Sequence, residues 1–344
     1  MDRRIIFAIA AVAAAVSLTA AVWKPWSSRS LGPFEPEDPP MTKKEGFASG
    51  RDPLAGVKEV AFDQERFLKY VKQLCDIGPR ISGTEGMRKQ QDVIIKHFES
   101  LGGKVTKQSF EEKQRSRRDK TPMMNIIVSW YPDKARRVIL CCHYDTRPIA
   151  DQESERRNWN RPFLSANDGT SGVAMMMELA HSMKSINPNV GVDFVFFDGE
   201  EYVFDTNPAR PDVYFIGSEY FAKDYITNKD KRKMSYEGAM LFDLCHHEKA
   251  NIRVEMHSWE QNPAFVQQIY TIAKQVDAKS FIFERGEAVM DDHLALMNVR
   301  IPTVDVIDFG YVNWHKLTDT PDKISGKQAA EVAKVSMTWI QSIK

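Results

Sequence analysis

The fold is decided by residues 192–201, which read Val-Asp-Phe-Val-Phe-Phe-Asp-Gly-Glu-Glu. The first six of these residues are mostly apolar and rich in β-branched and aromatic side chains, which is typical of a strand buried on both faces. Acidic side chains follow the apolar run at once. We therefore predict a buried strand whose carboxyl end carries a polar cluster formed by Asp198, Glu200 and Glu201.

Three further segments of the chain repeat this pattern. Apolar runs at residues 137–142, 238–242 and 302–307 predict strands, and a cluster of polar residues follows each one. Helical patterns alternate with the strands at residues 171–185, 218–226, 262–276 and 325–343. Such alternation requires crossover connections and predicts a largely parallel sheet with helices on both faces. Sheets of this kind bind ligands beyond the carboxyl ends of their strands, where the polar clusters are expected to lie.

The N-terminal segment predicts export from the cytoplasm. Arg3 and Arg4 precede an apolar run from Ile5 to Trp23, which as a helix would be about 28 Å long, close to the thickness of a bilayer's hydrocarbon core. We expect residues 1–23 to be a cleaved signal peptide or a membrane anchor, so that the protein is secreted, periplasmic or held on a membrane. The Pro-rich residues 24–56 predict a flexible stalk.

Residues 57–344 predict one α/β domain, because the series of strands and helices is unbroken. We expect its first elements to be helices at residues 62–76 and 83–100, followed by a strand at residues 104–110. Long polar loops in compact domains are commonly lids or binding loops, and residues 146–166 form such a loop. Its side chains are expected either to touch substrate or to face solvent; the candidates for contact are Arg147, Trp159 and Arg161.

Composition excludes some classes of function. The chain has 344 residues, and its 47 Lys and Arg balance 47 Asp and Glu, so the formal net charge is zero and nothing indicates nucleic-acid binding. The basic run at residues 113–120 lacks interleaved aromatic residues and predicts a solvated hairpin loop. Four cysteines are too few and too irregularly spaced for a disulfide scaffold, so we expect them to be small core residues.

The polar clusters contain the residue types that a catalytic zinc site requires. Zinc accepts imidazole nitrogen and carboxylate oxygen, and a catalytic site keeps one position open. Asp168, Glu201 and His315 could supply three ligands from separate strand ends, and His143 and Asp243 could complete a second site that shares Asp168. Any one of these residues alone would usually be polar surface, but their joint occurrence favours a metal site.

Other polar residues have plainer expected roles. Glu200, next to a proposed ligand, suits a general base. His293 is expected to open a helix or orient a neighbour rather than bind metal. Asp319 and Asp322 are expected to shape a turn and cap the last helix.

At these residues the chain resembles the zinc-dependent exopeptidase superfamily, and within it the glutaminyl-peptide cyclotransferases beside the dizinc aminopeptidases. The resemblance covers residues 62–344. The matching motifs are His143-Tyr-Asp145, the run Ala-Asn-Asp-Gly-Thr-Ser-Gly around Asp168, Asp198-Gly-Glu200-Glu201, Asp243-Leu, Asp292-His293 and His315-Lys-Leu-Thr-Asp319. The resemblance implies an α/β/α sandwich with a mixed, mostly parallel central sheet. It also implies zinc on Asp168, Glu201 and His315, with Glu200 as the acid and base.

Two branches of the superfamily share most of these residues. Asp291 before the Asp-His pair and Trp314 before the ligand histidine resemble the cyclases, in which Trp314 would line the substrate pocket. The chain departs from the animal cyclases in two places: residues 202–206 contain no tryptophan, and Asp305 stands where those enzymes have a histidine. In the run Thr-Ser-Gly, by contrast, Gly172 resembles the pattern of the peptidases.

Three functions are therefore compared. As a cyclase, the protein would bind one zinc ion and convert the N-terminal glutamine of peptides or proteins to pyroglutamate, with Glu200 moving the proton and Asp243 and Asp291 orienting the reacting groups. As an aminopeptidase, it would bind two zinc ions and hydrolyse the first peptide bond. The third possibility is a non-catalytic binding domain of the same fold. We expect the cyclase.

Overall fold

This computed structural model describes residues 54, 56–207 and 209–344. The expected signal or anchor segment at residues 1–23 and nearly all of the stalk at residues 24–56 lie outside that range. Within the described residues, no helix is both long and apolar enough to cross a membrane.

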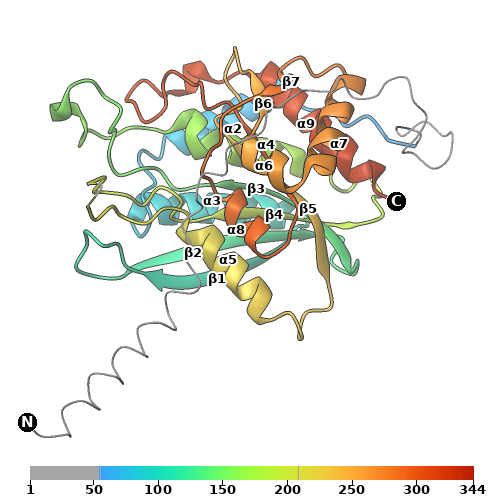
Figure 1. Cartoon of the computed structure of the whole chain (residues 1–344), viewed down its shortest axis with the longest axis horizontal. Helices are drawn as coiled ribbons and strands as arrows, with labels where there is room; N and C mark the ends of the chain where they lie inside the picture. The colour runs from blue at the N-terminus through green and yellow to red at the C-terminus, as the bar shows by residue number, and fades with distance from the viewer. Residues whose placement is uncertain (1–53, 55, 208) are drawn as a thin grey trace, which may run out of the picture. The chain divides into compact units, whose positions relative to one another are not determined.

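A six-stranded mixed sheet forms the centre of the domain (Figure 1). In spatial order its strands are β1 (Lys104–Glu112), β2 (Thr121–Trp130), β4 (Gly191–Phe197), β3 (Arg136–His143), β5 (Ser235–Asp243) and β8 (Thr303–Ile307). β2 pairs antiparallel with both of its neighbours, whereas β4, β3, β5 and β8 are parallel to one another. The expectation of a mixed, mostly parallel sheet is confirmed.

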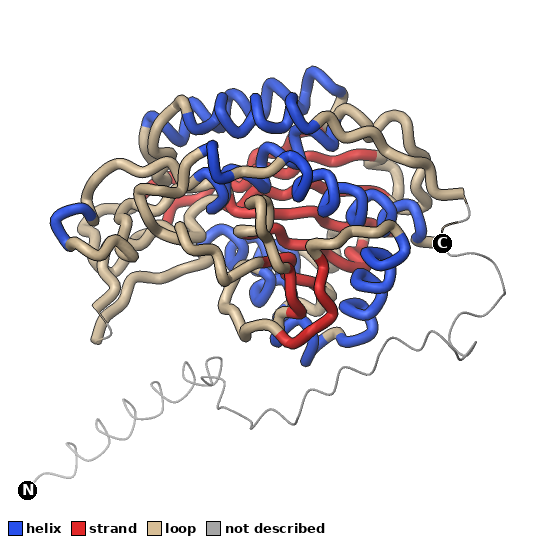
Figure 2. Tube along the Cα trace, turned by 90° about the horizontal axis from the view of Figure 1, so that it is seen from above, coloured by secondary structure: helices blue, strands red, loops and turns tan. Residues whose placement is uncertain are grey.

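Helices cover both faces of this sheet (Figure 2). One face packs against α2 (Gln64–Cys75), α3 (Glu85–Leu101), α4 (Ser171–Ala180), α7 (Pro263–Gln275) and α9 (Gly326–Ser342). The other face packs against α5 (Ile216–Thr227) and α8 (His293–Asn298). Alternate residues of β4 serve the two cores: Phe194 and Phe196 face the first, and Val195 and Phe197 face the second. The α/β/α sandwich is therefore confirmed.

Smaller elements complete the domain. Parallel strands β6 (Ile252–Val254) and β7 (Phe281–Arg285) form a separate two-stranded sheet, and α6 (Met256–Gln261) packs beside β8. Short helical turns occur at η1 (Arg156–Asn158), η2 (Ala166–Thr170) and η3 (Pro321–Lys323). All four cysteines are buried and free, as expected of core residues.

The sequence missed one strand, and two of its expectations about helices were wrong. β2 was not predicted. The helix expected at residues 171–185 ends at Ala180 and continues as turns. The last helix is capped by Ser325, whose hydroxyl accepts the Gln328 N–H, and not by Asp319 or Asp322.

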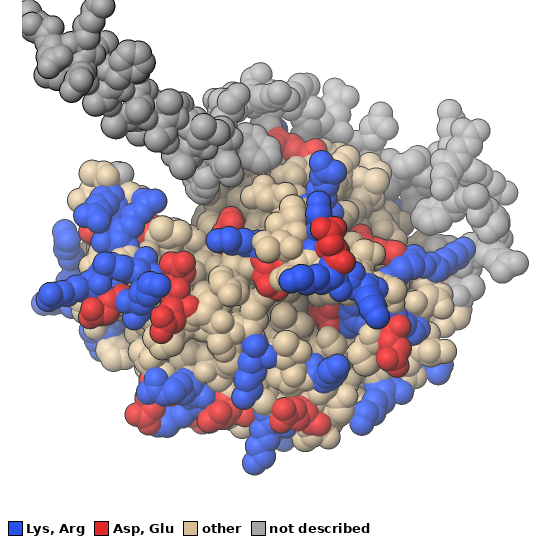
Figure 3. Space-filling model, turned by 90° about the horizontal axis from the view of Figure 1, so that it is seen from below, with Lys and Arg blue, Asp and Glu red and all other residues tan. Residues whose placement is uncertain are grey.

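Charged side chains of both signs lie next to one another on the face shown in Figure 3. The basic residues 113–120 form the hairpin loop between β1 and β2, as expected. One member of this loop, Gln114, is buried, and its side-chain amide donates to the carbonyl oxygens of Tyr202 and Val213. The loop is therefore tied to the segment that follows β4.

The connections place a crevice at the carboxyl ends of the central strands. The chain leaves β3 for α4 on one face of the sheet and leaves β4 for α5 on the other face. Connections that depart to opposite faces leave an opening between the strand ends, which is where such sheets bind ligands. β3 ends at His143, β4 precedes Glu200 and Glu201, and β5 ends at Asp243.

Candidate active site

The Glu200–Glu201 pair follows β4 in a tight turn that its neighbours hold in place. Gly199 has a φ of 77°, a conformation that favours glycine, and an added Cβ would lie 2.8 Å from Met123 Sδ. The carboxylate of Asp145, just beyond β3, accepts the N–H groups of Glu200 and Glu201 at 3.1 Å each. One carboxylate thus fixes the backbone of both acidic residues.

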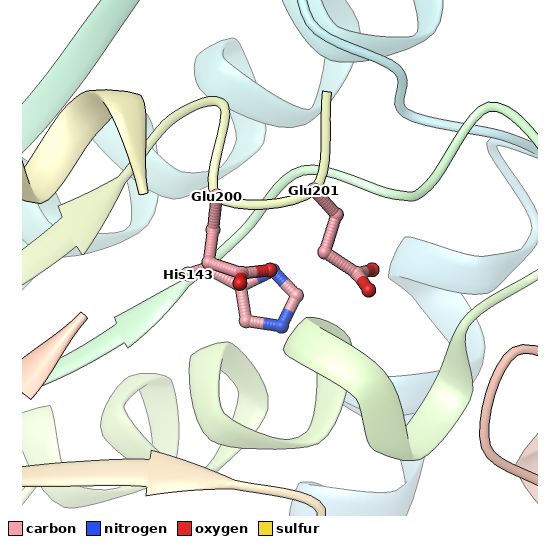
Figure 4. Close-up of side chains that lie close together, drawn as sticks. All are labelled: His143, Glu200 and Glu201. Atoms are coloured by element: carbon pink, nitrogen blue, oxygen red, sulfur yellow. The ribbon is translucent and has the colours of Figure 1, made fainter. Parts of the chain in front are cut away.

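His143, Glu200 and Glu201 extend toward a common space beyond the strand ends (Figure 4). The Nδ1 atom of His143 lies 3.9 Å from Oε2 of Glu200. Burial, and then the charge of Glu201, raise the pKa of Glu200 well above its ordinary value. A carboxyl group whose pKa is raised in this way can exchange protons with a reacting amine.

The three residues proposed as zinc ligands are brought together by the fold. Ligand atoms of Asp168, Glu201 and His315 all lie within 4.8 Å of one another, and all three residues are buried. His315 Nε2 is 3.8 Å from Asp168 Oδ2 and hydrogen-bonds with Glu201 Oε1. Asp168 Oδ2 and Glu201 Oε2 are buried and find no hydrogen-bond partner among the described residues. One imidazole and two carboxylates with unpaired oxygens fit the donor set of a catalytic zinc ion.

Asp168 is positioned by Asp319, a contact that the sequence did not predict. Asp168 lies in η2, and its backbone N–H donates to Asp319 Oδ2 at 3.2 Å. The same carboxylate accepts the Asn167 N–H at 3.0 Å and the Tyr311 hydroxyl at 2.7 Å. Burial, and then the charge of Asp168, raise the pKa of Asp319 to about 7. The last polar turn of the chain therefore holds a ligand that lies far from it in sequence.

His315 is positioned by a carboxylate from the loop at residues 146–166. Its Nδ1 atom lies 2.9 Å from Asp151 Oδ1. The buried Arg147 donates to both oxygens of Asp151, at 3.0 and 2.9 Å. A carboxylate that orients the imidazole of a metal ligand in this way is common at zinc sites.

The charges around His315 favour a cation at this position. Burial opposes protonation of the imidazole, but Glu201 and Asp151 outweigh it and raise the pKa of His315 to about 9. Burial likewise opposes ionisation of Asp151, yet His315 and Arg147 lower its pKa to about 2. Carboxylates on both sides of the ring thus attract positive charge.

A second group of potential ligands shares Asp168. His143 Nε2 lies 3.1 Å from Asp168 Oδ1 and 3.5 Å from Asp243 Oδ1. In the part of the chain that the structure describes, neither ring nitrogen of His143 has a hydrogen-bond partner. Gly169 allows this approach, because a Cβ there would lie 2.7 Å from His143 Cε1. The geometry could therefore hold a second ion on His143, Asp168 and Asp243.

Asp291 is buried close to this group. Burial, and then the charge of Asp243, raise the pKa of Asp291 well above its ordinary value. Asp291 accepts the Asp292 N–H at 2.5 Å, and its Oδ2 has no hydrogen-bond partner within the described chain. Asp305 is also buried, and one of its carboxylate oxygens lies 3.5 Å from His293 Nδ1.

Apolar side chains form one border of the site. The ring of Trp314 lies 4.0 Å from the ring of His315 and 4.9 Å from that of Phe309, measured between centroids. Two large apolar side chains are mostly exposed: Met290, which precedes Asp291, at 66%, and Val312, two residues before Trp314, at 74%. Trp314 is therefore next to a proposed ligand, where a substrate-facing side chain would be expected.

The loop at residues 146–166, predicted either to touch substrate or to face solvent, supports the site from one side. Its Asp151 contacts His315, and Glu153 accepts the Leu317 N–H at 2.8 Å, so the loop supports the His315 segment. Trp159 donates its indole N–H within the loop, to the Glu153 carbonyl oxygen. Arg147 is buried and pairs with Asp151, so it supports that carboxylate, and its contact with substrate stays a prediction.

Comparisons with known proteins show which family and which solved structures this chain is similar to. Residues 125–340 match the model of Peptidase family M28. A glutaminyl-peptide cyclotransferase of Drosophila melanogaster is 27% identical over 177 residues, which span 47% of this chain and 46% of the fly protein. The crystal structure of Fimbriiglobus ruber glutaminyl cyclase shares 53% identity and a TM-score of 0.82 over 83% of this chain and 97% of that one. A leucine aminopeptidase precursor from Bacteroides thetaiotaomicron shares 30% identity and a TM-score of 0.78 over 84% and 100%.

Proposed function

We propose that this chain, which belongs to Peptidase family M28, is a glutaminyl-peptide cyclotransferase. Such an enzyme converts N-terminal glutamine to pyroglutamate and releases ammonia. The observation that carries the proposal is the 53% identity to the glutaminyl cyclase of Fimbriiglobus ruber, over 97% of that chain. Two residues at which the sequence resembles the cyclases also support the proposal: Asp291 is buried and feels the charge of Asp243, and the ring of Trp314 lies 4.0 Å from that of His315.

Asp168, Glu201 and His315 would hold one zinc ion. Their convergence and their unpaired buried oxygens support this assignment. When bound, zinc acts as a Lewis acid that polarises a carbonyl oxygen. Asp151 and Asp319 keep two of the ligands in their orientations, through Nδ1 of His315 and the backbone N–H of Asp168.

Glu200 would move the proton of the reaction. The α-amine of the substrate attacks the carbonyl carbon of its own glutamine side chain, a C–N bond forms, and the bond to the amide nitrogen breaks. Glu200 accepts the proton that the amine loses and gives it to the departing ammonia. Its raised pKa and its buried place beside Glu201 support this role.

Asp243 and Asp291 would orient the reacting nitrogen atoms and Glu200. Both carboxyl groups have raised pKa values because they are buried, so they can donate as well as accept hydrogen bonds. Fixed orientation of this kind removes much of the entropy cost of reaching the transition state. Trp314 would pack against the substrate side chain.

A dizinc aminopeptidase is the second candidate. The group formed by His143, Asp168 and Asp243 favours it, because these three residues could hold another ion. The similarity to the leucine aminopeptidase precursor points in the same direction. A non-catalytic binding domain is less well supported, since every expected ligand and Glu200 are present at the site.

Mass spectrometry of peptides separates these candidates. The purified protein is incubated with one peptide that begins with glutamine and with a matched peptide that begins with leucine. We expect the first to lose ammonia and the second to stay intact. Release of free leucine would reject the cyclase in favour of the aminopeptidase, and no change in either peptide would reject both. Zinc per chain, measured on the same sample, should be one for the cyclase and two for the peptidase.

We also propose that peptide or protein N-termini are the partners and that the protein acts outside the cytoplasm. Basic residues before the apolar run at residues 5–23 support export. Fractionation of cells that produce the full chain tests this: we expect the protein in the membrane or secreted fraction, and recovery only from the cytoplasm would contradict it.

A further inference from the structure

A buried cluster next to the site has no part in the mechanism described above. It consists of Glu255, which precedes α6, His293 at the start of α8 and Asp305 in β8. At most 2% of each residue is exposed. Burying three ionisable groups is costly unless they pair with one another or with other polar groups, so their contacts should show what they do.

Glu255 contacts the chain on both sides of Asp291. Its Oε1 accepts the N–H of Val289 at 3.0 Å, and its Oε2 lies 3.2 Å from Nε2 of His293. Val289 and His293 are two residues before and two residues after Asp291. One carboxylate therefore spans the turn that carries this proposed catalytic residue.

The carboxylate of Glu255 is itself firmly held. It caps α6 by accepting the N–H groups of His257 at 2.9 Å and Ser258 at 2.7 Å, and it accepts the Ser258 hydroxyl at 2.8 Å. The hydroxyl oxygen of Ser258 in turn accepts the N–H of Asp305 at 3.1 Å. Because these bonds join α6, β8 and the turn before α8, movement of Glu255 would disturb all three.

His293 lies between two carboxylates, and one ligand atom from each of the three residues lies within 4.8 Å of the others. Its Nε2 faces Glu255 at 3.2 Å, whereas its Nδ1 faces Asp305 at 3.5 Å. The two nitrogens point to different sides of the ring, but ligands of a metal ion must aim at a common centre. Neither nitrogen of His293 and neither carboxylate oxygen of Asp305 makes a hydrogen bond among the described residues. Because the two closest contacts use opposite nitrogens of the ring, the arrangement suits an imidazole held between two carboxylates better than a metal site.

Asp291 depends on Glu255 and His293 for its position. The hydrogen bond to its side chain comes from its neighbour Asp292, and its Oδ2 is unpaired within the described residues. Contacts that fix the backbone before and after Asp291 must then decide where its carboxyl group lies. Glu255 supplies one contact to the backbone N–H of Val289, before Asp291, and one to the imidazole of His293, after it.

We propose that Glu255 and His293 are positioning residues, which hold Asp291 at the place where it orients the reacting nitrogen and Glu200. The inference rests on the cyclase function proposed above. Neither residue needs to touch substrate. Their effect passes through the backbone at Val289 and through the imidazole of His293.

Steady-state kinetics of Glu255→Gln and His293→Ala test the proposal. A glutamine presents an amide N–H₂ where a second oxygen accepted hydrogen bonds, so one side of the Asp291 turn loses its acceptor. We expect kcat to fall by about 10- to 100-fold, because small misplacements of catalytic groups cost rate. KM should stay within about twofold, and zinc per chain should be unchanged. His293→Gln, which keeps a donor toward Glu255, should recover part of the loss.

Glu178→Gln is the matched control. Like Glu255, Glu178 is a buried glutamate that accepts a backbone N–H, here from Asp63, but its other partner is Arg66, and it lies on α4, which packs in a different core from α8. The Glu178→Gln variant should have a lower melting temperature and an unchanged kcat. The double variant Glu255→Gln/His293→Ala should lose little more than the worse single variant, because the contact between Glu255 and His293 is already disturbed in either one.

The outcomes separate this inference from the proposed function. Pyroglutamate formation by the wild type, with kcat of both variants within twofold of it, would overturn the inference alone. An equal fall of kcat in the Glu178 control, or loss of zinc from Glu255→Gln, would also overturn it. If the wild type makes no pyroglutamate, the proposed function fails, and the inference that rests on it fails as well.

Discussion

Replacing Asp151 with alanine should weaken zinc binding although Asp151 is not a proposed ligand. Its carboxylate holds Nδ1 of His315 at 2.9 Å, so the ring keeps Nε2 directed at Glu201 and Asp168. Without this contact the ring can rotate, and the imidazole becomes a weaker donor. Loss of such an outer contact costs about 10- to 100-fold in metal affinity, which is about 1.4 to 2.8 kcal/mol at 1.4 kcal/mol per tenfold change.

The same substitution should also destabilise the zinc-free protein. Arg147 is buried and makes two hydrogen bonds to Asp151. Removing one partner of a buried ion pair costs about 3 to 5 kcal/mol, since the remaining charge is left uncompensated. Asp151→Asn should be milder in both respects, because its amide oxygen can still accept a hydrogen bond from His315.

Competition with a chelating indicator measures the zinc affinity, and denaturant unfolding of the chelator-treated protein measures the stability. Glu155→Ala is the control: Glu155 lies in the same loop, but its side chain is 52% exposed and pairs with the exposed Arg157. It should change neither quantity, as exposed pairs contribute little. If Asp151→Ala binds zinc as tightly as the wild type, the supporting role of the loop is wrong.

Three further results are expected. Glu200→Gln should lower kcat by about 10²- to 10⁴-fold with zinc per chain unchanged, because Glu200 is outside the proposed ligand set; metal loss would reassign it. Trp314→Ala should raise KM for glutamine peptides more than it lowers kcat, and an unchanged KM would remove Trp314 from the pocket wall. Zinc affinity should rise by about tenfold per pH unit up to about pH 9 and then level off. The reason is that the zinc-free His315 is protonated below its pKa of about 9 and must release that proton to bind; a flat profile between pH 6 and 8 would contradict this.

The central strands could be predicted because their burial on both faces leaves a signal in the sequence. β4 is apolar at all but one position and enters both cores, so its pattern needed no knowledge of its neighbours. β2 was missed because it mixes apolar residues with Asn125 and Ser129. These polar side chains are satisfied by tertiary contacts: Asn125 donates to Gly217, and Ser129 donates to Asp193.

The residues of the site likewise fall into those that the sequence predicts and those that it does not. His143, Glu201 and Asp243 stand at or just after predicted strands, so parallel topology alone indicates that they meet. Asp151 lies in a polar loop with several acidic neighbours, and nothing local distinguishes it from them.

Supporting residues such as Asp151 take their roles from contacts with residues far away in the sequence. Asp151 meets a histidine 164 residues away, and Glu255 meets the Val289 backbone 34 residues away. Their roles depend on how loops fold over the strand ends, and hydrophobic periodicity carries no information about that.

Anomalous scattering at the zinc edge, from crystals of the protein grown with zinc, tests the central claim most directly. The account predicts one strong peak bounded by Asp168, Glu201 and His315. Crystals of His315→Ala grown in the same way should lack it. Absence of the peak from the wild type, or a peak at another place, would contradict the account.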